Sequence, residues 1–219
     1  MNKLPPENIY AHTKKLKYFI KIINERLKLK KKISVLDFGC GNGRAVSQYI
    51  AGANICYYGV DLHKESVKYA RNCFGRKDIY FDFDFAALPC QKFDVIIYSD
   101  ILEHLEDPSL ILKNHYSLLS DDGVIIGSVP NGRGPFEIEK KIDVCLGITK
   151  TIEELGKIKR KIFHKKDIVT VVPYNSDSGH LQFFSCDKLY SLFESSGYKI
   201  IDFANGSFLG APLSERFIF

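Results

Sequence analysis

The sequence contains no long apolar run and no closely spaced pair of cysteines. No stretch reaches the roughly 18 uninterrupted apolar residues that span a bilayer, and the start, MNKLPPENIYAHTKK, lacks the apolar segment of a signal peptide. We therefore expect a soluble, cytoplasmic protein. The six cysteines are Cys40, Cys56, Cys73, Cys90, Cys145 and Cys186. Because no two of them form a C-x-x-C pair, we expect reduced, packed thiols rather than a zinc site or a redox centre.

Positive charge is concentrated at the start of the chain. The formal net charge is +5, and residues 1–32 hold ten lysines or arginines against the acids Glu7 and Glu25. Such a surplus could attract a phosphate-rich partner. Apolar residues in the same segment recur at helical spacing, and they are Leu16, Phe19, Ile20, Ile23 and Leu27. We favour a basic amphipathic helix over about residues 10–29, with its lysines on the outer, solvated side.

Short apolar runs alternate with helical patterns through the middle of the chain. The runs are ISVLDF (33–38), ICYYGV (55–60), DIYFDF (78–83), DVIIYS (94–99) and GVIIGSV (123–129). Their Val, Ile, Tyr and Phe content is typical of buried parallel strands, and a β-helix-β rhythm predicts right-handed crossovers. The expected fold is a doubly wound, Rossmann-like α/β sandwich of three layers. We expect one domain over residues 1–219.

The alternation stops between Asn131 and Gly179. This stretch opens with the rigid turn VPNGRGP and ends near the irregular PYNSDSG. A segment of that length inside a domain is usually functional, so we predict that residues 131–180 form a lid over a binding site. The tail resumes with the helix CDKLYSLFESS, which Gly197 is expected to end, and with strands at YKIIDFA and RFIF.

A glycine-rich loop follows the first apolar run. VLDFGCGNGR places Asp37 in a buried strand and then Gly39, Gly41 and Gly43 before a helix, where glycine lets the backbone approach a ligand. Dinucleotide enzymes use G-x-G-x-x-G at this point, but here the third glycine falls one residue early and is followed by Arg44. An acid before the loop repels a pyrophosphate and suits a ligand with an ammonium and a sulfonium group.

Four motifs together resemble one enzyme family. They are D-x-G-x-G-x-G at 37–43, Asp61 at the end of YYGVD, an acid before the LP of DFAALP, and SDILEHLEDP after the fourth run. From about Ser34 to Ala204 the set resembles class I S-adenosylmethionine-dependent methyltransferases, in particular the ubiquinone-pathway O-methyltransferase group. The resemblance implies S-adenosylmethionine as cofactor. It also implies a mostly parallel seven-stranded sheet with an antiparallel last strand.

The resemblance implies where the methionine part of the cofactor lies. It implies that the backbone of Gly39 and Gly41 lines the methionine moiety and the sulfonium, and that Cys40 and Asn42 in the same loop also bind the cofactor. It also implies that Asp37 orients this loop or meets the cofactor's amino group.

The resemblance also implies the contacts to the nucleoside. Asp61 is expected to accept hydrogen bonds from both ribose hydroxyls, with Leu62 beside the adenine. The alternative for Asp61 is an N-cap of the following helix. Asp84 is expected to accept from the adenine amino group, and its neighbour Phe85 offers a backbone N–H. Asp82 is the competing acid.

The segment after the fourth run carries polar groups at the carboxyl edge of the sheet. Ser99 and Asp100 are expected to face the cofactor there. Asp100, Glu103 and His104 stand at helical spacing, which would gather two carboxylates and an imidazole as a partial site for a divalent cation. They also resemble the E-x-x-E-H motif of metal-assisted methyltransferases. Metal-free relatives use the same positions for hydrogen bonds, so no metal ligand is assigned and a divalent metal is not expected.

A second group of candidates concerns catalysis. His180 in SGHLQFFS follows the lid segment and resembles the H-x-x-x-F-S stretch of related enzymes. Methyl transfer to a hydroxyl gains from a base that takes its proton, and neutral histidine is suited to this role near pH 7. His180 is our first choice for the base, with His104 and Glu103 in reserve. The alternative is that His180 only pins a loop by a hydrogen bond.

The expected activity is O-methylation of a small molecule or a sugar or glycan precursor, with selectivity from residues 131–180. An RNA-directed methyltransferase is an alternative, although the chain shows no separate nucleic-acid module. A catalytically silent S-adenosylmethionine-binding partner subunit is another. SDIL stands where amino-methylating enzymes that act on flipped bases carry D/N-P-P-Y/F/W, which disfavours that class.

Overall fold

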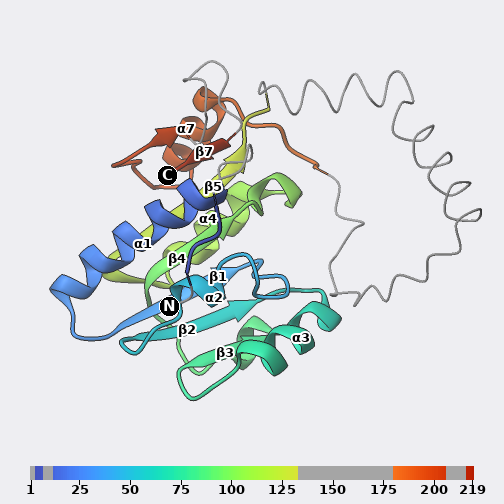
Figure 1. Cartoon of the computed structure of the whole chain (residues 1–219). Coiled ribbons are helices and arrows are strands. Elements are labelled where there is room, and N and C mark those ends of the chain that lie inside the picture. The colour runs from blue at the N-terminus through green and yellow to red at the C-terminus, as the bar shows by residue number, and fades with distance from the viewer. Residues whose placement is uncertain (1–2, 7–11, 133–179, 206–215) are drawn as a thin grey trace, which may run out of the picture.

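A computed structural model shows that the chain is built around one sheet (Figure 1). The structure describes all residues except 1–2, 7–11, 133–179 and 206–215. Within the described residues the strand order is β3-β2-β1-β4-β5-β7-β6. Strands β1 to β5 pair in parallel, whereas β7 is antiparallel to both β5 and β6. The expected Rossmann-like α/β fold is confirmed for the five parallel strands.

The strand bounds follow the apolar runs closely. The strands are β1 (Ile33–Phe38), β2 (Ile55–Val60), β3 (Ile79–Asp82), β4 (Phe93–Ser99), β5 (Leu119–Pro130), β6 (Ala204–Asn205) and β7 (Arg216–Ile218). Parallel strands covered on both sides read as continuous apolar runs, which is why the first five could be found from sequence. Their carboxyl ends meet at one edge of the sheet.

In the sequence, α1 precedes β1 and the other helices lie between successive strands. The helices are α1 (His12–Leu29), α2 (Ser47–Ile50), α3 (Lys64–Phe74), α4 (Pro108–Tyr116), α7 (Cys186–Ser195) and the short 3₁₀ turns η1 (Phe85–Ala87) and η2 (Leu102–His104). Gly197 follows α7 with φ +89°, as its predicted role as a helix stop requires. None of the described helices is sufficiently long and apolar to cross a membrane.

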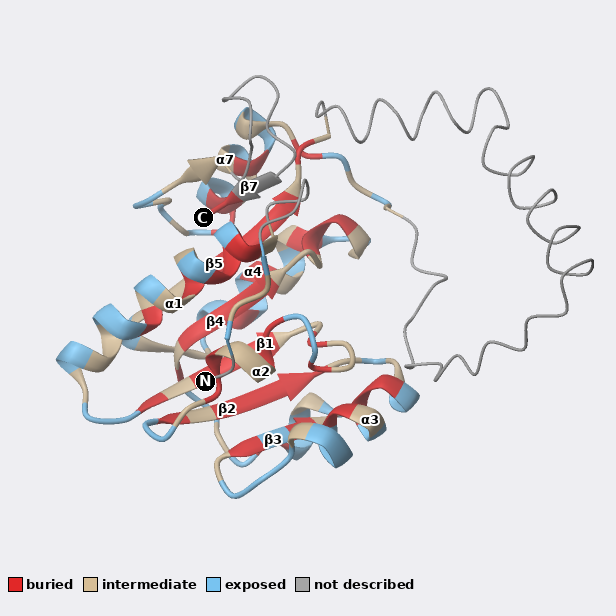
Figure 2. Cartoon of the chain, viewed as in Figure 1, coloured by how far each residue is buried: buried red, intermediate tan, exposed pale blue. Residues whose placement is uncertain are grey.

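Helices pack on both faces of the sheet. Val35 and Ile97 belong to one core with side chains from α1 and α3, whereas their neighbours Leu36 and Ile96 belong to a second core with side chains from α4 and α7. Consecutive strand residues point to opposite faces, so each of these strands contributes side chains to both cores. Figure 2 shows these strands buried between the helices. The predicted three layers follow from this alternation.

Two predicted elements are shorter than expected. RAVSQYI forms a helix only at Ser47–Ile50, because residues 44–46 are turns. The strand expected at YKIIDFA is reduced to Ala204–Asn205. Within the part of the chain that the structure describes, β7 pairs with those two residues of this segment, and Ile201 is 76% exposed. An edge segment without a neighbour to pair with gains no ladder hydrogen bonds, so apolar content alone does not make it a strand.

Lys15 contradicts the prediction that the lysines of α1 lie on its outer side. Lys14, Lys17, Lys21 and Lys28 are exposed, but Lys15 is only 1% exposed. It stands four residues before Phe19, on the apolar stripe of the helix, so helical geometry directs it into the core. A lysine is almost never fully buried unless it is paired, and its partners lie at the candidate site.

Candidate functional site

The glycine loop between β1 and α2 combines tight packing with an open approach. Gly39 has φ +78°, and a Cβ there would lie 2.5 Å from the Ile101 side chain. Gly41 has φ +53°, yet a Cβ there would meet nothing within 4 Å. Both positions require glycine for their backbone conformation, but only Gly41 borders open space. The loop therefore offers its backbone to a ligand beside Gly41.

Asp37 lies fully buried in β1, just before this loop. It accepts a hydrogen bond from the hydroxyl of Tyr57 on β2. Its Oδ1 atom has no hydrogen-bond partner within the described residues. Burial raises the pKa of Asp37 to about 7, against the lowering effects of the Tyr57 hydroxyl and of Lys15. The site thus contains a buried acid with an oxygen that a cationic ligand could satisfy.

Asp61 joins the end of β2 to the glycine loop. Its Oδ2 accepts from the Gly41 N–H at 2.8 Å, and its Oδ1 accepts from the His63 N–H at 2.8 Å. The alternative that Asp61 is the N-cap of α3 is wrong, because His63 precedes the helix and its side chain accepts from the Ser66 N–H. Each carboxylate oxygen keeps capacity for a second hydrogen bond. The adjacent Leu62 is 90% exposed.

The two acids after β3 have different partners. Asp82 pairs with Arg71 at 3.0 Å, and its other oxygen accepts from the N–H groups of Phe83 and Asp84. Asp84 is exposed and caps η1 by accepting from the Ala86 N–H at 2.9 Å. Because Asp82 is held by Arg71, Asp84 is the acid better placed to accept from a ligand.

The end of β4 is held by α1 and β5. Lys15 donates to Ser99 Oγ at 2.9 Å and to Asp100 Oδ2 at 2.8 Å. Ser128 Oγ donates to Asp100 Oδ1 at 2.8 Å, and the Asp100 N–H donates to the Ser128 carbonyl. Asp100 has φ +56°, an uncommon conformation for a residue other than glycine. Lys15 and Ser128 therefore fix Asp100 in that conformation.

Two histidines and a glutamate gather beyond this point. Glu103, His104 and His180 each place one potential ligand atom within 4.8 Å of the others. The rings of His104 and His180 are 5.0 Å apart, and Glu103 is 2% exposed. Helical spacing suggested a partial cation site of Asp100, Glu103 and His104. The structure instead places His180, and not Asp100, beside Glu103 and His104. Asp100 faces Lys15 and Ser128, and η2 is a 3₁₀ turn rather than an α-helix.

The backbone holds His180 at this place. The Glu103 carbonyl accepts from the N–H groups of Leu181 at 2.8 Å and Gln182 at 2.9 Å. Asn131 forms a β-bridge with Phe184, and the Gly132 N–H donates to the Phe184 carbonyl at 2.8 Å. Residues 131–132, which open the predicted lid, and residues 180–184, which start at its last residue, are thus joined beside η2 and are called the stems below. The rest of that prediction, residues 133–179, lies outside the described residues.

Comparison with known proteins identifies the family. Residues 10–202 match the family described as “Methyltransferase domain”. The chain belongs to this methyltransferase family. The chain is 35% identical over 107 residues to the ubiquinone biosynthesis O-methyltransferase of Actinobacillus pleuropneumoniae serotype 5b (strain L20), covering 44% of this chain and 45% of that protein. The protein of that name from Coxiella burnetii (strain Dugway 5J108-111) is 30% identical over 117 residues, with 51% and 49% covered.

These similarities are partial in extent. The chain spans about half the length of the curated relatives it matches. Among solved structures, the magnesium protoporphyrin IX methyltransferase from Synechocystis PCC 6803 with bound SAM aligns with a TM-score of 0.55 and 18% identity. That alignment covers 95% of this chain and 77% of that one. At such an identity it shows a shared fold.

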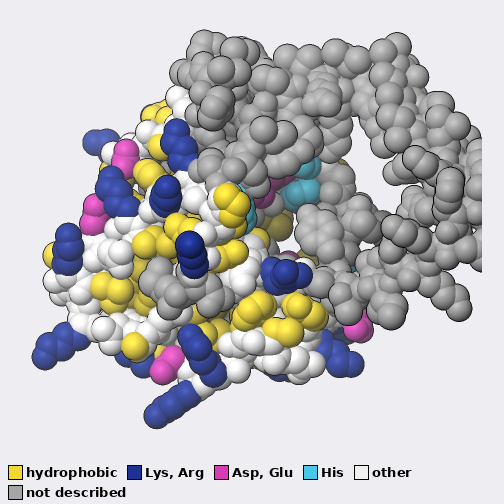
Figure 3. All heavy atoms as spheres, in the orientation of Figure 1, with side chains coloured by type: hydrophobic (Ala, Val, Ile, Leu, Met, Phe, Trp, Pro, Cys, Tyr) yellow, Lys and Arg dark blue, Asp and Glu magenta, His cyan; other side chains and the backbone are white. Residues whose placement is uncertain are grey.

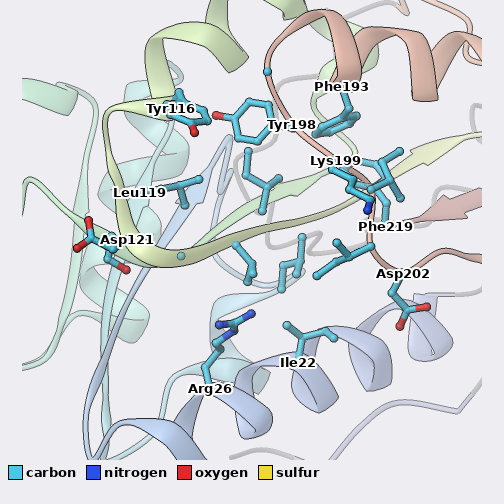
Figure 4. A pocket seen from close by; sticks show the side chains of 18 of the residues that line it. Ile22, Arg26, Tyr116, Leu119, Asp121, Phe193, Tyr198, Lys199, Asp202 and Phe219 are labelled. Atoms are coloured by element: carbon cyan, nitrogen blue, oxygen red, sulfur yellow. The ribbon is translucent and has the colours of Figure 1, made fainter.

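A cavity of about 700 Å³ lies away from this site (Figure 4). It opens between α1, the first half of β5 and residues 197–202, with Ile22, Arg26, Tyr198 and Asp202 among its walls. None of the residues proposed for the cofactor or for catalysis lines it. The first half of β5 belongs to the amino edge of the sheet, whereas the methyltransferase motifs stand at the carboxyl edge. The candidate site residues therefore lie at the opposite edge of the sheet from this cavity.

The lysines and arginines that the structure describes do not form one patch on the face seen in Figure 3. Lysine and arginine side chains are spread there among hydrophobic and polar surface. Nucleic-acid binding needs a basic stripe or groove that follows the phosphate backbone. This distribution agrees with the solvated-face interpretation of α1.

Proposed function

We propose that this methyltransferase binds S-adenosylmethionine at the carboxyl edge of its sheet and transfers the methyl group to an oxygen of a small-molecule or glycan acceptor. The observation that carries the proposal is the hydrogen bond from the Gly41 N–H to Asp61, which brings the open loop position and the candidate ribose acid together. The named O-methyltransferase relatives support an oxygen acceptor.

The residues fit the cofactor part by part. The buried Oδ1 of Asp37, which the described residues leave unsatisfied, suits the ammonium group of the methionine part. Gly39, Cys40, Gly41 and Asn42 supply the surrounding backbone. The sulfonium gains from the acids close to this loop, because opposite charges attract strongly where water is excluded.

Residues that follow β2 and β3 would bind the nucleoside part of the cofactor. Asp61 retains acceptor capacity for the ribose hydroxyls, and the exposed Leu62 is available to cover the adenine. Asp84 would accept from the adenine amino group, with the Phe85 N–H beside it. Ser99 and Asp100 would border the cofactor from β4.

We propose His180 as the base that takes the acceptor's proton. Methyl transfer is an in-line displacement at the methyl carbon, so the acceptor oxygen must lie opposite the sulfur with its proton removed. His180 is held beside Glu103 and His104, and Glu103 Oε1 lies 4.0 Å from His104 Nε2. Glu103 and His104 would therefore orient the acceptor and His180.

We also propose that residues 1–219 form a single domain with an appended helix within residues 1–32. Residues 131–180 would bind the acceptor, and β6 and β7 would be the last strands of a seven-stranded sheet. The joined stems at Asn131 and Phe184 support the acceptor segment.

Calorimetry tests the cofactor assignment. We expect binding of S-adenosylmethionine and S-adenosylhomocysteine but not of NAD. Asp61→Ala should weaken S-adenosylhomocysteine by about 1.5–3 kcal/mol, the usual size for hydrogen bonds to a charged group. His63→Ala is the matched control, because it removes only the α3 cap and should leave the affinity unchanged. Tight NAD binding without S-adenosylhomocysteine binding would refute the proposal.

Chelation tests whether Glu103, His104 and His180 act through a divalent cation. We expect methyl transfer to continue in excess EDTA, because Asp100 is held by Lys15 and Ser128, and a cluster with one carboxylate and two imidazoles offers too few oxygen ligands for Mg²⁺. The measurement is the initial rate with and without chelator. Loss of activity that added Mg²⁺, Mn²⁺ or Zn²⁺ restores would contradict this expectation and make the three residues metal ligands.

A further inference from the structure

His115 is a buried titratable residue without a role in the chemistry above. It lies near the end of α4 and is 8% exposed. Its Nδ1 shares a hydrogen bond of 2.6 Å with the Tyr98 hydroxyl. Phe38 meets its ring edge-on at 4.7 Å, and Phe85 stacks on it at 5.8 Å with an interplanar angle of 18°. One imidazole therefore contacts three other elements.

Each of these three partners stands next to the candidate cofactor site. Phe38 ends β1 and directly precedes Gly39, the first residue of the glycine loop. Phe85 opens η1 immediately after Asp84. Tyr98 precedes Ser99 at the end of β4. The imidazole thus packs behind the chain segments that border both the methionine side and the adenine side.

We propose that His115 is a positioning residue for the adenine side of the cofactor site, an inference that rests on the proposed function. The imidazole stacks on Phe85 and so fixes η1, together with Asp84, relative to the glycine loop. The Tyr98 hydroxyl fixes the orientation of the imidazole ring. A displaced η1 would move the Asp84 carboxylate and the Phe85 N–H away from the adenine.

The state of the ring supports this role. Burial lowers the pKa of His115 to about 4, so the imidazole is neutral at pH 7. Burial also raises the pKa of the Tyr98 hydroxyl, which keeps that partner neutral. A neutral ring can be buried among phenylalanines without the cost of desolvating a charge.

The test compares two ligands that differ only in the base. S-Adenosylhomocysteine carries the adenine amino group, and S-inosylhomocysteine carries a carbonyl in its place. We expect the wild type to prefer the adenine ligand. His115→Leu should weaken S-adenosylhomocysteine about tenfold through loss of the ring contacts and the hydrogen bond. It should weaken S-inosylhomocysteine much less, so the preference falls.

Three further variants complete the test. His115→Phe keeps a ring and should retain more of the preference, and it also serves if His115→Leu does not fold. Tyr98→Phe removes the hydroxyl partner of the same hydrogen bond. Its affinities for the two ligands should equal those of His115→Phe. Lys113→Leu, exposed on the same helix, is the control and should bind as the wild type does.

The outcomes separate this inference from the proposed function. A wild type that binds no S-adenosylhomocysteine refutes the proposed function. If the wild type binds it and His115→Leu keeps its affinity, or loses both ligands equally, His115 only fills space and the inference is overturned. An equal affinity of the wild type for both ligands overturns it as well. A selective loss of the adenine ligand supports it.

Discussion

His180→Ala is expected to lower kcat by about 10²–10⁴-fold, the usual contribution of a positioned base, with cofactor affinity nearly unchanged. The physical reason is that an acceptor hydroxyl keeps its proton without a neighbouring base and is then a poor nucleophile. Removal of the base should also abolish the acidic limb of the pH–rate profile. The measurement is the rate of methyl transfer against pH once an acceptor is found.

Gln182→Ala is the matched control for His180. It changes a neighbouring side chain on the same stem, whereas its backbone N–H can still donate to the Glu103 carbonyl. We expect its kcat to stay close to the wild-type value. If His180→Ala retains a normal kcat, His180 is structural and the base role passes to His104, whose ring lies 5.0 Å away.

Lys15→Met is expected to reduce the free energy of unfolding by about 3 kcal/mol, the lower end of the cost of breaking a buried ion pair. The lower end applies because the Asp100 side chain is 25% exposed, whereas that of Lys15 is 2% exposed. Methionine fills a similar volume but leaves the Asp100 carboxylate without its ammonium partner. Cofactor affinity should also fall, because Asp100 and Ser99 lose the group that fixes them.

Lys17→Met is the control for Lys15. Lys17 is exposed on the same helix, and such surface changes usually stay within about 0.5 kcal/mol of the wild type. Urea unfolding of both variants gives the comparison. Equal stability of the two variants would show that the contact between Lys15 and Asp100 contributes nothing.

The parallel part of the fold was accessible from sequence because burial on both faces leaves a local signal. The runs at 33–38 and 55–60 match β1 and β2 residue for residue. The strand at the edge of the sheet could not be predicted in the same way. YKIIDFA has the composition of a strand, but most of it has no paired neighbour among the described residues, and strand formation depends on the neighbour.

The candidate site shows the same division between local and distant information. The sequence alone predicts that Asp61, Gly41 and Asp37 lie near one another, because they stand at the ends of adjacent parallel strands, which meet at one edge of the sheet. The partner of Asp100 was not predictable, because Lys15 lies 85 positions away in the sequence. The signal that was present is the position of Lys15 on the apolar stripe of α1.

The joined stems at Asn131–Gly132 and Phe184 have a consequence for how this protein can diversify. The core itself brings the two ends of the intervening segment together, through the Asn131–Phe184 bridge and the Gly132 hydrogen bond. Loop-closure entropy grows slowly with length, by about 0.6 kcal/mol for each doubling. Segments of very different size could therefore be exchanged on these stems at small cost to folding. On the proposal that residues 131–180 bind the acceptor, the range of acceptors can change in evolution while the proposed cofactor site stays as it is.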